Sequence, residues 1–135
     1  MPRPTGNRLP GVSGRCPCGL GEPYPECCGA FHRGARTAGT AELLMRSRFS
    51  AYAVRDAEYL LRTWHSTTRP ASMEFDPGLR WTRLEIVGRT GGGPFHTQGT
   101  VEFNAHYRTS GGAEVMHENS SFVREDGDWV YLKAS

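Results

Sequence analysis

The sequence has no long apolar segment and almost no lysine. No stretch approaches the roughly 20 apolar residues that a membrane-spanning helix requires, and residues 1–14 carry Arg3 and Arg8 without the apolar segment of a secretory signal. Lysine supplies only one of the 16 basic residues, which together with 14 acidic residues give a net charge of +2. This balance disfavours a protein that binds nucleic acid by charge alone. We therefore expect a cytoplasmic protein that does not enter a membrane.

The length and composition predict a folded chain with one main core. With 135 residues, the chain has room for one compact domain and a small accessory element. Hydrophobic residues make up 37% of the sequence and include three tryptophans, which argues against disorder over most of the length.

Cysteines occur only in one short window, at Cys16, Cys18, Cys27 and Cys28. Without an export signal their thiols should stay reduced, and neighbouring Cys27 and Cys28 would form a strained bridge. Zn²⁺ binds four thiolates tetrahedrally, so the spacing favours a structural zinc site with no open position for catalysis. His32 is the reserve ligand if Cys28 points away. A redox-active thiol cluster and unliganded surface cysteines are the alternatives.

The residues around the cysteines support a metal-held loop. Gly19, Gly21 and Gly29 permit the tight backbone curvature that directs N–H groups toward thiolate sulfur. The segment is poor in apolar residues, so we expect metal binding to supply its folding energy.

Residues 16–29 closely resemble the SEC-C motif, a short zinc-binding element named for the C-terminus of the SecA translocation ATPase. Its usual pattern, C-x-C-G-S-G-x-x-Y-x-x-C-[CH], is matched here by the four cysteines and Tyr24, with Leu20 in place of the common serine. The resemblance implies that the motif binds a protein partner. We expect Tyr24, Phe31 and neighbouring arginines to form the contact surface.

In the rest of the chain, the spacing of apolar residues changes once, from the period of a helix to that of a strand. Apolar residues from Ala41 to Ala53 recur at the spacing of one helix face, with Thr40 as N-cap. Asp56 should cap a second helix that Pro70 ends. From Leu79 onward apolar and polar residues alternate, and turns at 110–112 and 126–127 predict hairpins. We therefore predict an α+β fold, a helical hairpin against a curved antiparallel sheet.

This order of elements is similar to the cone-shaped fold of nuclear transport factor 2 (NTF2). The segments 45–52, 59–65 and 117–122 further resemble the bacterial YchJ-like family, which joins an amino-terminal SEC-C motif to an NTF2-like domain. The implied domains are a zinc knuckle with a flexible tail at 1–35 and the NTF2-like domain at 36–135.

The cone is expected to enclose a cavity between sheet and helices. Glu118 and His65 are the candidate proton-transfer residues, because a desolvated carboxylate or an imidazole suits acid/base chemistry. The predicted pocket residues are Arg48, Phe49, Tyr52, Trp64, Arg69, Trp81, Ser120 and Phe122. In the alternative interpretation Trp64 and Trp81 are plain core, Glu118 pairs with Arg48, and His65 caps the second helix.

The expected function is a protein- or ligand-binding module with a structural zinc, as a monomer or homodimer. The first alternative is a small-molecule isomerase, dehydratase or cyclase that uses acid/base chemistry in the cone. The second is a ribosome or RNA adaptor, supported by five arginines in the first 36 residues (Arg3, Arg8, Arg15, Arg33 and Arg36). Because no aromatics interleave with these arginines, nucleic acid is an unlikely partner.

Overall fold

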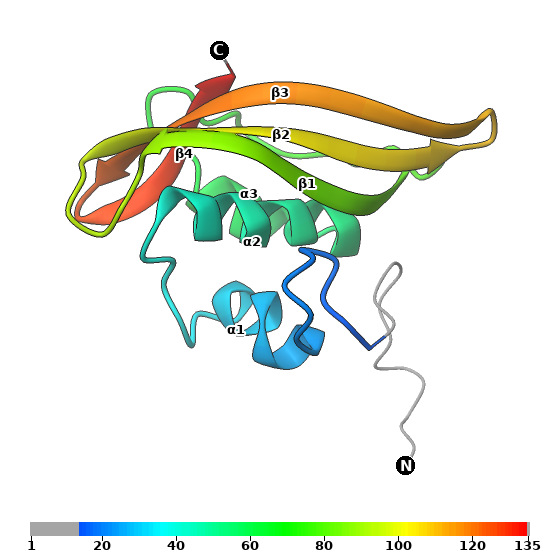
Figure 1. The fold of residues 1–135 in the computed structure, drawn as a ribbon, viewed down its shortest axis with the longest axis horizontal. Coiled ribbons are helices and arrows are strands. Elements are labelled where there is room, and N and C mark those ends of the chain that lie inside the picture. The colour runs from blue at the N-terminus through cyan, green and yellow to red at the C-terminus, as the bar shows by residue number, and fades with distance from the viewer. Residues whose placement is uncertain (1–13, 135) are drawn as a thin grey trace.

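Residues 14–134, which the computed structural model describes, form three layers. Figure 1 shows a curved sheet, then the helices α2 and α3, and then a small unit on the side of α2 away from the sheet. In chain order the elements are the 3-10 helix η2 (Tyr24–Glu26), α1 (Cys28–His32), α2 (Ala41–Val54), α3 (Ala57–Arg62), β1 (Arg80–Gly91), β2 (Gln98–Thr109), β3 (Gly112–Glu125) and β4 (Asp128–Ala134). None of the helices within 14–134 is long and apolar enough to cross a membrane.

The four strands form an antiparallel meander in sequence order, β1-β2-β3-β4. β2 and β3 pair without interruption from Gln98↔Val123 to Thr109↔Gly112, whereas β1 shifts register against β2 between Ile86 and Gly88. Such bulges increase strand twist and bend, which helps the sheet to curve around α2.

The alternation along the strands follows the predicted period of two. In β2, Val101, Phe103 and Ala105 are buried, while the residues between them are only half-buried. The turn between β3 and β4 places Asp126 at φ 55° and Gly127 at φ 89°, and positive φ at both positions suits a two-residue hairpin. The α+β prediction, with helices on one face of a curved antiparallel sheet, is confirmed.

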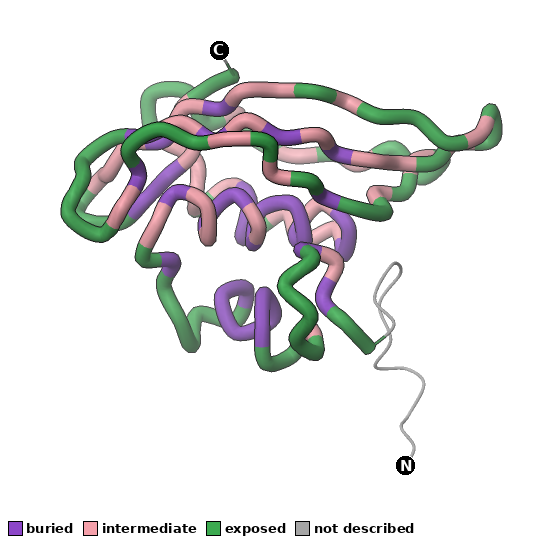
Figure 2. Tube along the Cα trace, viewed as in Figure 1, coloured by how far each residue is buried: buried purple, intermediate pink, exposed green. Residues whose placement is uncertain are grey.

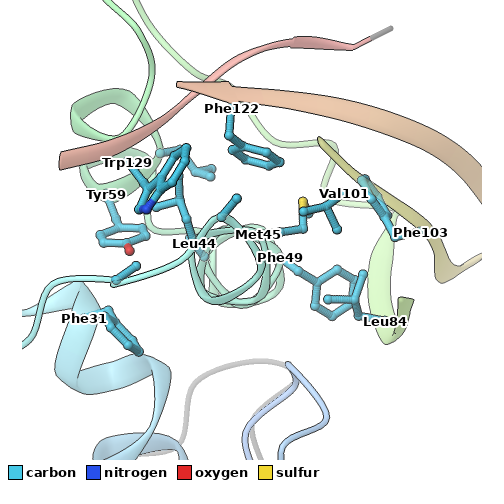
Figure 3. Close-up of a cluster of buried hydrophobic side chains, with 14 of the residues drawn as sticks. Phe31, Leu44, Met45, Phe49, Tyr59, Leu84, Val101, Phe103, Phe122 and Trp129 are labelled. Atoms are coloured by element: carbon cyan, nitrogen blue, oxygen red, sulfur yellow. The ribbon is translucent and has the colours of Figure 1, made fainter. Parts of the chain in front are cut away.

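The main core lies between α2 and the sheet. Figure 3 shows Phe49 of α2 beside Leu84 of β1 and Met45 of α2 beside Val101 of β2, all within the core cluster. Each such buried side chain stabilises the fold by roughly 1.5–3 kcal/mol. Trp129 is 2% exposed and donates its Nε1 hydrogen to the carbonyl oxygen of Gly39 at 3.2 Å, so the chain entering α2 is held to β4.

Helix α2 is buried along most of its length: ten of its 14 residues are buried (Figure 2). Besides the apolar residues that face the sheet, Ser47 and Ser50 are both 0% exposed. The small unit that carries the cysteines covers this second, polar face. α2 is therefore the middle layer of the molecule.

The predicted second helix is shorter than expected. Asp56 caps it, because its Oδ1 accepts from the backbone N–H of Tyr59 at 3.0 Å. α3 nevertheless ends at Arg62, well before Pro70. The next residues turn to β4: Tyr131 N–H donates to Thr63 O, and His65 N–H donates to Tyr131 O, both at 2.8 Å. Backbone pairing with the sheet edge thus ends the helix.

Candidate metal centre and ligand cavity

The four cysteine side chains converge on one point. Their Sγ atoms all lie within 4.8 Å of one another, and none of the four residues is more than 4% exposed. Tetrahedral coordination with Zn–S bonds of about 2.3 Å requires sulfur atoms about 3.8 Å apart, and Cys18 Sγ lies 3.6 Å from Cys27 Sγ. The donor set therefore fits a tetrahedral metal ion without solvent ligands.

The thiols share charge unequally. The pKa of Cys16 lies far below its usual range because the thiols of Cys18 and Cys28 donate hydrogen bonds to its sulfur. The same interaction raises the pKa of Cys18 to about 12 and that of Cys28 further still, while burial raises the pKa of Cys27. Four thiolates at this spacing need a cation among them.

Two segments bring the cysteine pairs together. The backbone N–H of Cys16 donates to Glu22 O at 2.8 Å, which closes the first loop. Gly19 and Gly21 adopt φ of 91° and 90°, the left-handed conformation that the prediction assigned to them. Gly29 is different: it lies in α1, and a Cβ there would meet Tyr24 O at 2.7 Å. Its small size, not unusual curvature, permits the close packing of α1 on η2.

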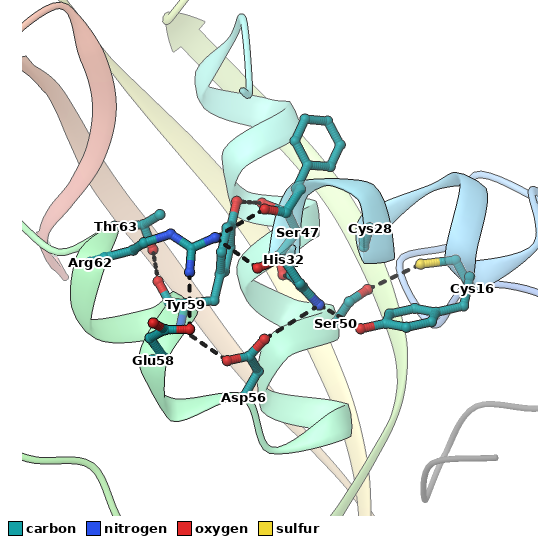
Figure 4. Close-up of polar contacts among 12 residues, drawn as sticks. Cys16, Cys28, His32, Ser47, Ser50, Asp56, Glu58, Tyr59, Arg62 and Thr63 are labelled. Carbon is teal, nitrogen blue, oxygen red and sulfur yellow. Dashed lines mark hydrogen bonds and ion pairs between the residues drawn. The ribbon is translucent and has the colours of Figure 1, made fainter. Parts of the chain in front are cut away.

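His32 is not a ligand but the link between this unit and α2 (Figure 4). Its Nε2–H donates to Ser47 O at 2.8 Å, so in the neutral ring Nδ1 accepts from the Tyr24 hydroxyl at 2.6 Å. Burial lowers the pKa of His32, which favours this neutral form. The ring also packs on Tyr59 with centroids 4.6 Å apart.

Polar contacts complete the attachment of the cysteine unit to the helices. Cys16 Sγ lies 3.3 Å from Ser50 Oγ, and Arg46 Nη1 donates to Cys18 O at 2.7 Å. Arg62 Nη2 donates to the carbonyls of Phe31 and His32 at 3.1 and 2.8 Å. The contact sites are mainly serine hydroxyls and main-chain carbonyls, which explains why apolar periodicity does not reveal them.

The expected docking surface is partly wrong. Phe31 is 3% exposed and belongs to the main core, so it cannot contact a partner. Among the predicted basic residues, Arg15 and Arg33 donate to carbonyls of the knuckle itself, and Arg36 lies over the Phe31 ring. Arg3 and Arg8 lie outside the described residues.

A cavity of about 210 Å³ lies between α2 and the sheet. Half of its twelve lining residues are only half-buried, so its wall reaches the surface. The lining consists of Met45, Arg48, Phe49, Tyr52, Trp64, Trp81, Phe103, Ala105, Met116, Glu118, Ser120 and Tyr131.

Arg48 and Glu118 give the cavity one group of each charge. The Arg48 Nη1 group donates to Leu60 O at 2.8 Å and to Thr63 Oγ1 at 2.7 Å, at the end of α3. Glu118 Oε2 accepts from Ser120 Oγ at 2.6 Å. Within residues 14–134, Arg48 forms no ion pair shorter than 4 Å, so the alternative Glu118–Arg48 pair does not form.

Burial changes the acidity of groups in the cavity. It lowers the pKa of the Arg48 guanidinium, an effect that the surrounding tyrosines oppose. Burial also raises the pKa of Tyr52, and raises that of Tyr131 to about 12, with the Glu118 charge adding to both shifts. Both hydroxyls are therefore neutral hydrogen-bonding groups at neutral pH.

Comparison with known proteins identifies the family. The family described as "YchJ, middle NTF2-like domain" matches residues 40–134. The chain belongs to this YchJ-like family. A UPF0225 protein of Streptomyces avermitilis is 56% identical over 130 residues, covering 96% of this chain and 88% of that protein. A UPF0225 protein of Deinococcus radiodurans is 44% identical, covering 100% of this chain and 99% of that protein.

Two solved structures show the same fold. The solution structure of a SEC-C motif containing protein from Rhodopseudomonas palustris is 32% identical, with a TM-score of 0.76 over 90% of this chain and 97% of that chain. A crystal structure of such a protein from Psychrobacter arcticus is 27% identical, with a TM-score of 0.73 over 91% and 82%. Both the YchJ-like recognition and the NTF2-like fold are thus confirmed.

The YchJ-like cavity contains some of the predicted pocket residues and not others. Glu118 lines it, together with Arg48, Phe49, Tyr52, Trp64, Trp81 and Ser120. Phe122 lies in the core at 0% exposure, and Arg69 is exposed with its guanidinium on Trp64 O. His65 lies beyond α3, with Nδ1 2.7 Å from Thr67 Oγ1, so it neither caps that helix nor lines the cavity.

The remaining lining residues were missed for two reasons. Met45, Phe103, Ala105 and Met116 lie on the inner faces of α2 and the strands, and which of these apolar residues border the expected cavity depends on the spacing between the layers. Tyr131 belongs to a short strand whose position over Arg48 depends on the bridge between Trp64 and Tyr131. No local sequence signal marks that bridge.

Proposed function

We propose that this YchJ-like chain is a binding module in which the four cysteines hold a structural zinc ion and the cavity receives a small molecule. The observation that carries the proposal is the cavity of about 210 Å³, which has a buried cation at one point of its lining and a carboxylate at another. Such charges are rare in a packed core, because burying a charged group is costly unless the group is paired and hydrogen-bonded.

Zinc is the metal that the donor set favours. Four thiolates in a closed site are typical of structural zinc, whereas harder ions prefer oxygen ligands. A zinc ion held by Cys16, Cys18, Cys27 and Cys28 would stabilise the fold and contribute no chemistry to a substrate. A redox role is less well supported, because each thiol is 4% exposed or less.

Metal analysis tests the zinc proposal. Purified protein should contain one zinc ion per chain, and replacing both Cys27 and Cys28 by serine should remove it. A native protein that contains no metal and whose thiols react freely would overturn this part of the proposal.

Ligand binding is tested through the tryptophans of the cavity. Small fragment-sized compounds that bind there should change the fluorescence of Trp64 and Trp81, which both line it. Ala105→Leu, which adds side-chain volume to the lining, should abolish these changes while the protein stays folded. Identical responses of the wild type and Ala105→Leu across the compounds would refute binding in the cavity.

An acid/base enzyme is the second candidate, and one observation favours it. Glu118 lines the cavity and its Oε2 accepts from Ser120 Oγ, so a carboxylate is held in place beside any ligand. His65 lies outside the cavity, which leaves Glu118 as the proton-transfer group. Turnover of a bound compound that is lost in Glu118→Gln, with binding retained, would favour this candidate over a binding module.

The cellular location and the protein partner of the knuckle are inferred from the sequence alone. We propose a cytoplasmic protein whose knuckle contacts a protein partner, as the SEC-C resemblance implies. Leu20, 47% exposed, is the large apolar side chain that the described part of the knuckle offers to such a partner. Co-purification that is lost in Leu20→Ser, with zinc retained, tests this contact.

A further inference from the structure

Trp64 has a buried indole N–H with no hydrogen-bond partner. Within residues 14–134, its Nε1 is the one buried side-chain nitrogen or oxygen left without one. Buried donors are almost always paired because burial removes their water. The indole ring lines the cavity, but Nε1 itself is covered and is not a contact for a molecule bound there.

A cation lies beside this donor. The Arg48 guanidinium lies 5.1 Å from the Trp64 ring centroid and 4.8 Å from that of Tyr131. The residue is 3% exposed, and its hydrogen-bond partners, Leu60 O, Thr63 Oγ1 and the Tyr52 hydroxyl, are all neutral oxygens. A buried guanidinium without an anion is costly, and a carboxylate is the group that matches its planar set of donors.

The rest of the lining suits a ring. Six of the twelve lining residues are aromatic, and Met45 and Met116 add polarisable sulfur. A cavity of about 150 Å³ with apolar walls accommodates benzene. At about 210 Å³, this one has room for a single ring with one substituent.

Glu118 restricts where the negative end of a ligand can lie. Its carboxylate lines the same cavity and would repel a second carboxylate placed beside it. A ligand anion is therefore favoured near Arg48 and away from Glu118.

We infer that the cavity binds a monocyclic aromatic carboxylate, with its carboxylate on Arg48 and its ring among the aromatic side chains. This inference rests on the proposed function, because it names the ligand class of the same cavity. It also specifies that the ligand is negatively charged and that its charged end lies at Arg48, which apolar binding alone would not require.

Benzoate and benzamide have nearly the same shape, but only benzoate is charged. Comparing their affinities therefore tests whether the cavity prefers an anion. Calorimetric titration of the full-length, metal-containing protein should show benzoate binding at least about tenfold more tightly, since a hydrogen bond to a charged group favours the anion. Equal affinity for both compounds would overturn the inference and leave ligand binding in the cavity standing. No binding of either compound would also overturn it, while the fluorescence comparison with Ala105→Leu still decides the proposed function.

Charge variants should change benzoate affinity in opposite directions. Arg48→Met should reduce it about tenfold or more, to the level of benzamide, and Glu118→Gln should increase it by removing repulsion. Arg89→Met is the matched control, because Arg89 is 63% exposed and lies outside the lining. If Arg48→Met fails to fold, Glu118→Gln carries the test. Unchanged benzoate affinity in Glu118→Gln would then overturn the inference.

Discussion

The close contact between α1 and η2 predicts that a larger residue at Gly29 disturbs the cysteine unit. Alanine normally favours a helix over glycine by about 1 kcal/mol. At this position, however, the new Cβ would lie 2.7 Å from Tyr24 O and 3.1 Å from Tyr24 Cε2. The first distance is shorter than a normal contact and involves backbone, which cannot rotate away. Gly29→Ala should therefore push α1 from η2 and disturb the sulfur geometry.

Overpacking of this kind typically costs about 1–3 kcal/mol. If the whole cost falls on the metal-bound form, it corresponds to a loss of zinc affinity of about 5- to 150-fold. If it falls on global stability, the melting temperature drops by roughly 3–15 °C for a chain of this size. Competition with a chromogenic zinc chelator and a thermal melt measure the two quantities.

Gly39→Ala provides the matched control. A Cβ at Gly39 meets nothing within 4 Å, and its φ is not among the positive ones, so this substitution should be neutral or slightly stabilising. Gly29→Ala with the zinc affinity and melting temperature of Gly39→Ala would refute the close-packing argument.

Three other perturbations test separate parts of the structure. Chelating the metal should lower the melting temperature and disorder the knuckle while the far-ultraviolet strand signal persists; complete unfolding would contradict this. Tyr59→Phe should cost about 1–2 kcal/mol in urea unfolding, because it removes a 2.7 Å hydrogen bond to the buried Ser47 hydroxyl; an unchanged midpoint would refute this role. Burial raises the pKa of Tyr131 to about 12 from 10.0, so its contribution to stability is complete below pH 10 and is lost as the pH rises through 12. Burial also raises the pKa values of Tyr24, Tyr52 and Tyr59, so a tyrosinate absorbance titration should show a late component that is smaller by one tyrosine in Tyr131→Phe.

Local signals in the sequence were sufficient to predict the strands and the clustering of the four cysteines. The alternation of apolar and polar residues in β2 reflects the one face that packs on the core. The Asp126–Gly127 pair predicts the turn, because a two-residue hairpin needs positive φ at both positions and these residue types tolerate it. The cysteine spacing alone suggested a tetrahedral site. These features depend on neighbouring residues, and for that reason they can be predicted.

Features that depend on packing between layers were not predictable. Ser47 and Ser50 are polar and lie outside the predicted apolar stripe of the helix, yet both are completely buried under the cysteine unit. Likewise α3 ends at Arg62 because residues 63–65 pair with β4, a partner more than 60 positions away. Nothing within the helix sequence itself specifies either contact.

The two buried faces of α2 differ in how much free energy is gained by covering them. Its apolar face must stay covered, because exposing Leu44 and Phe49 would lose several kcal/mol of hydrophobic stabilisation. Its other face presents the Ser50 hydroxyl and the main-chain carbonyl of Ser47 to the knuckle, and water can hydrogen-bond these groups almost as well as the knuckle does. Docking of the knuckle therefore gains little from these polar contacts, and Phe31 is its one large apolar contribution to the core. We therefore expect the domain to fold around the first face alone, and we propose that metal binding supplies the free energy that orders the knuckle on the second.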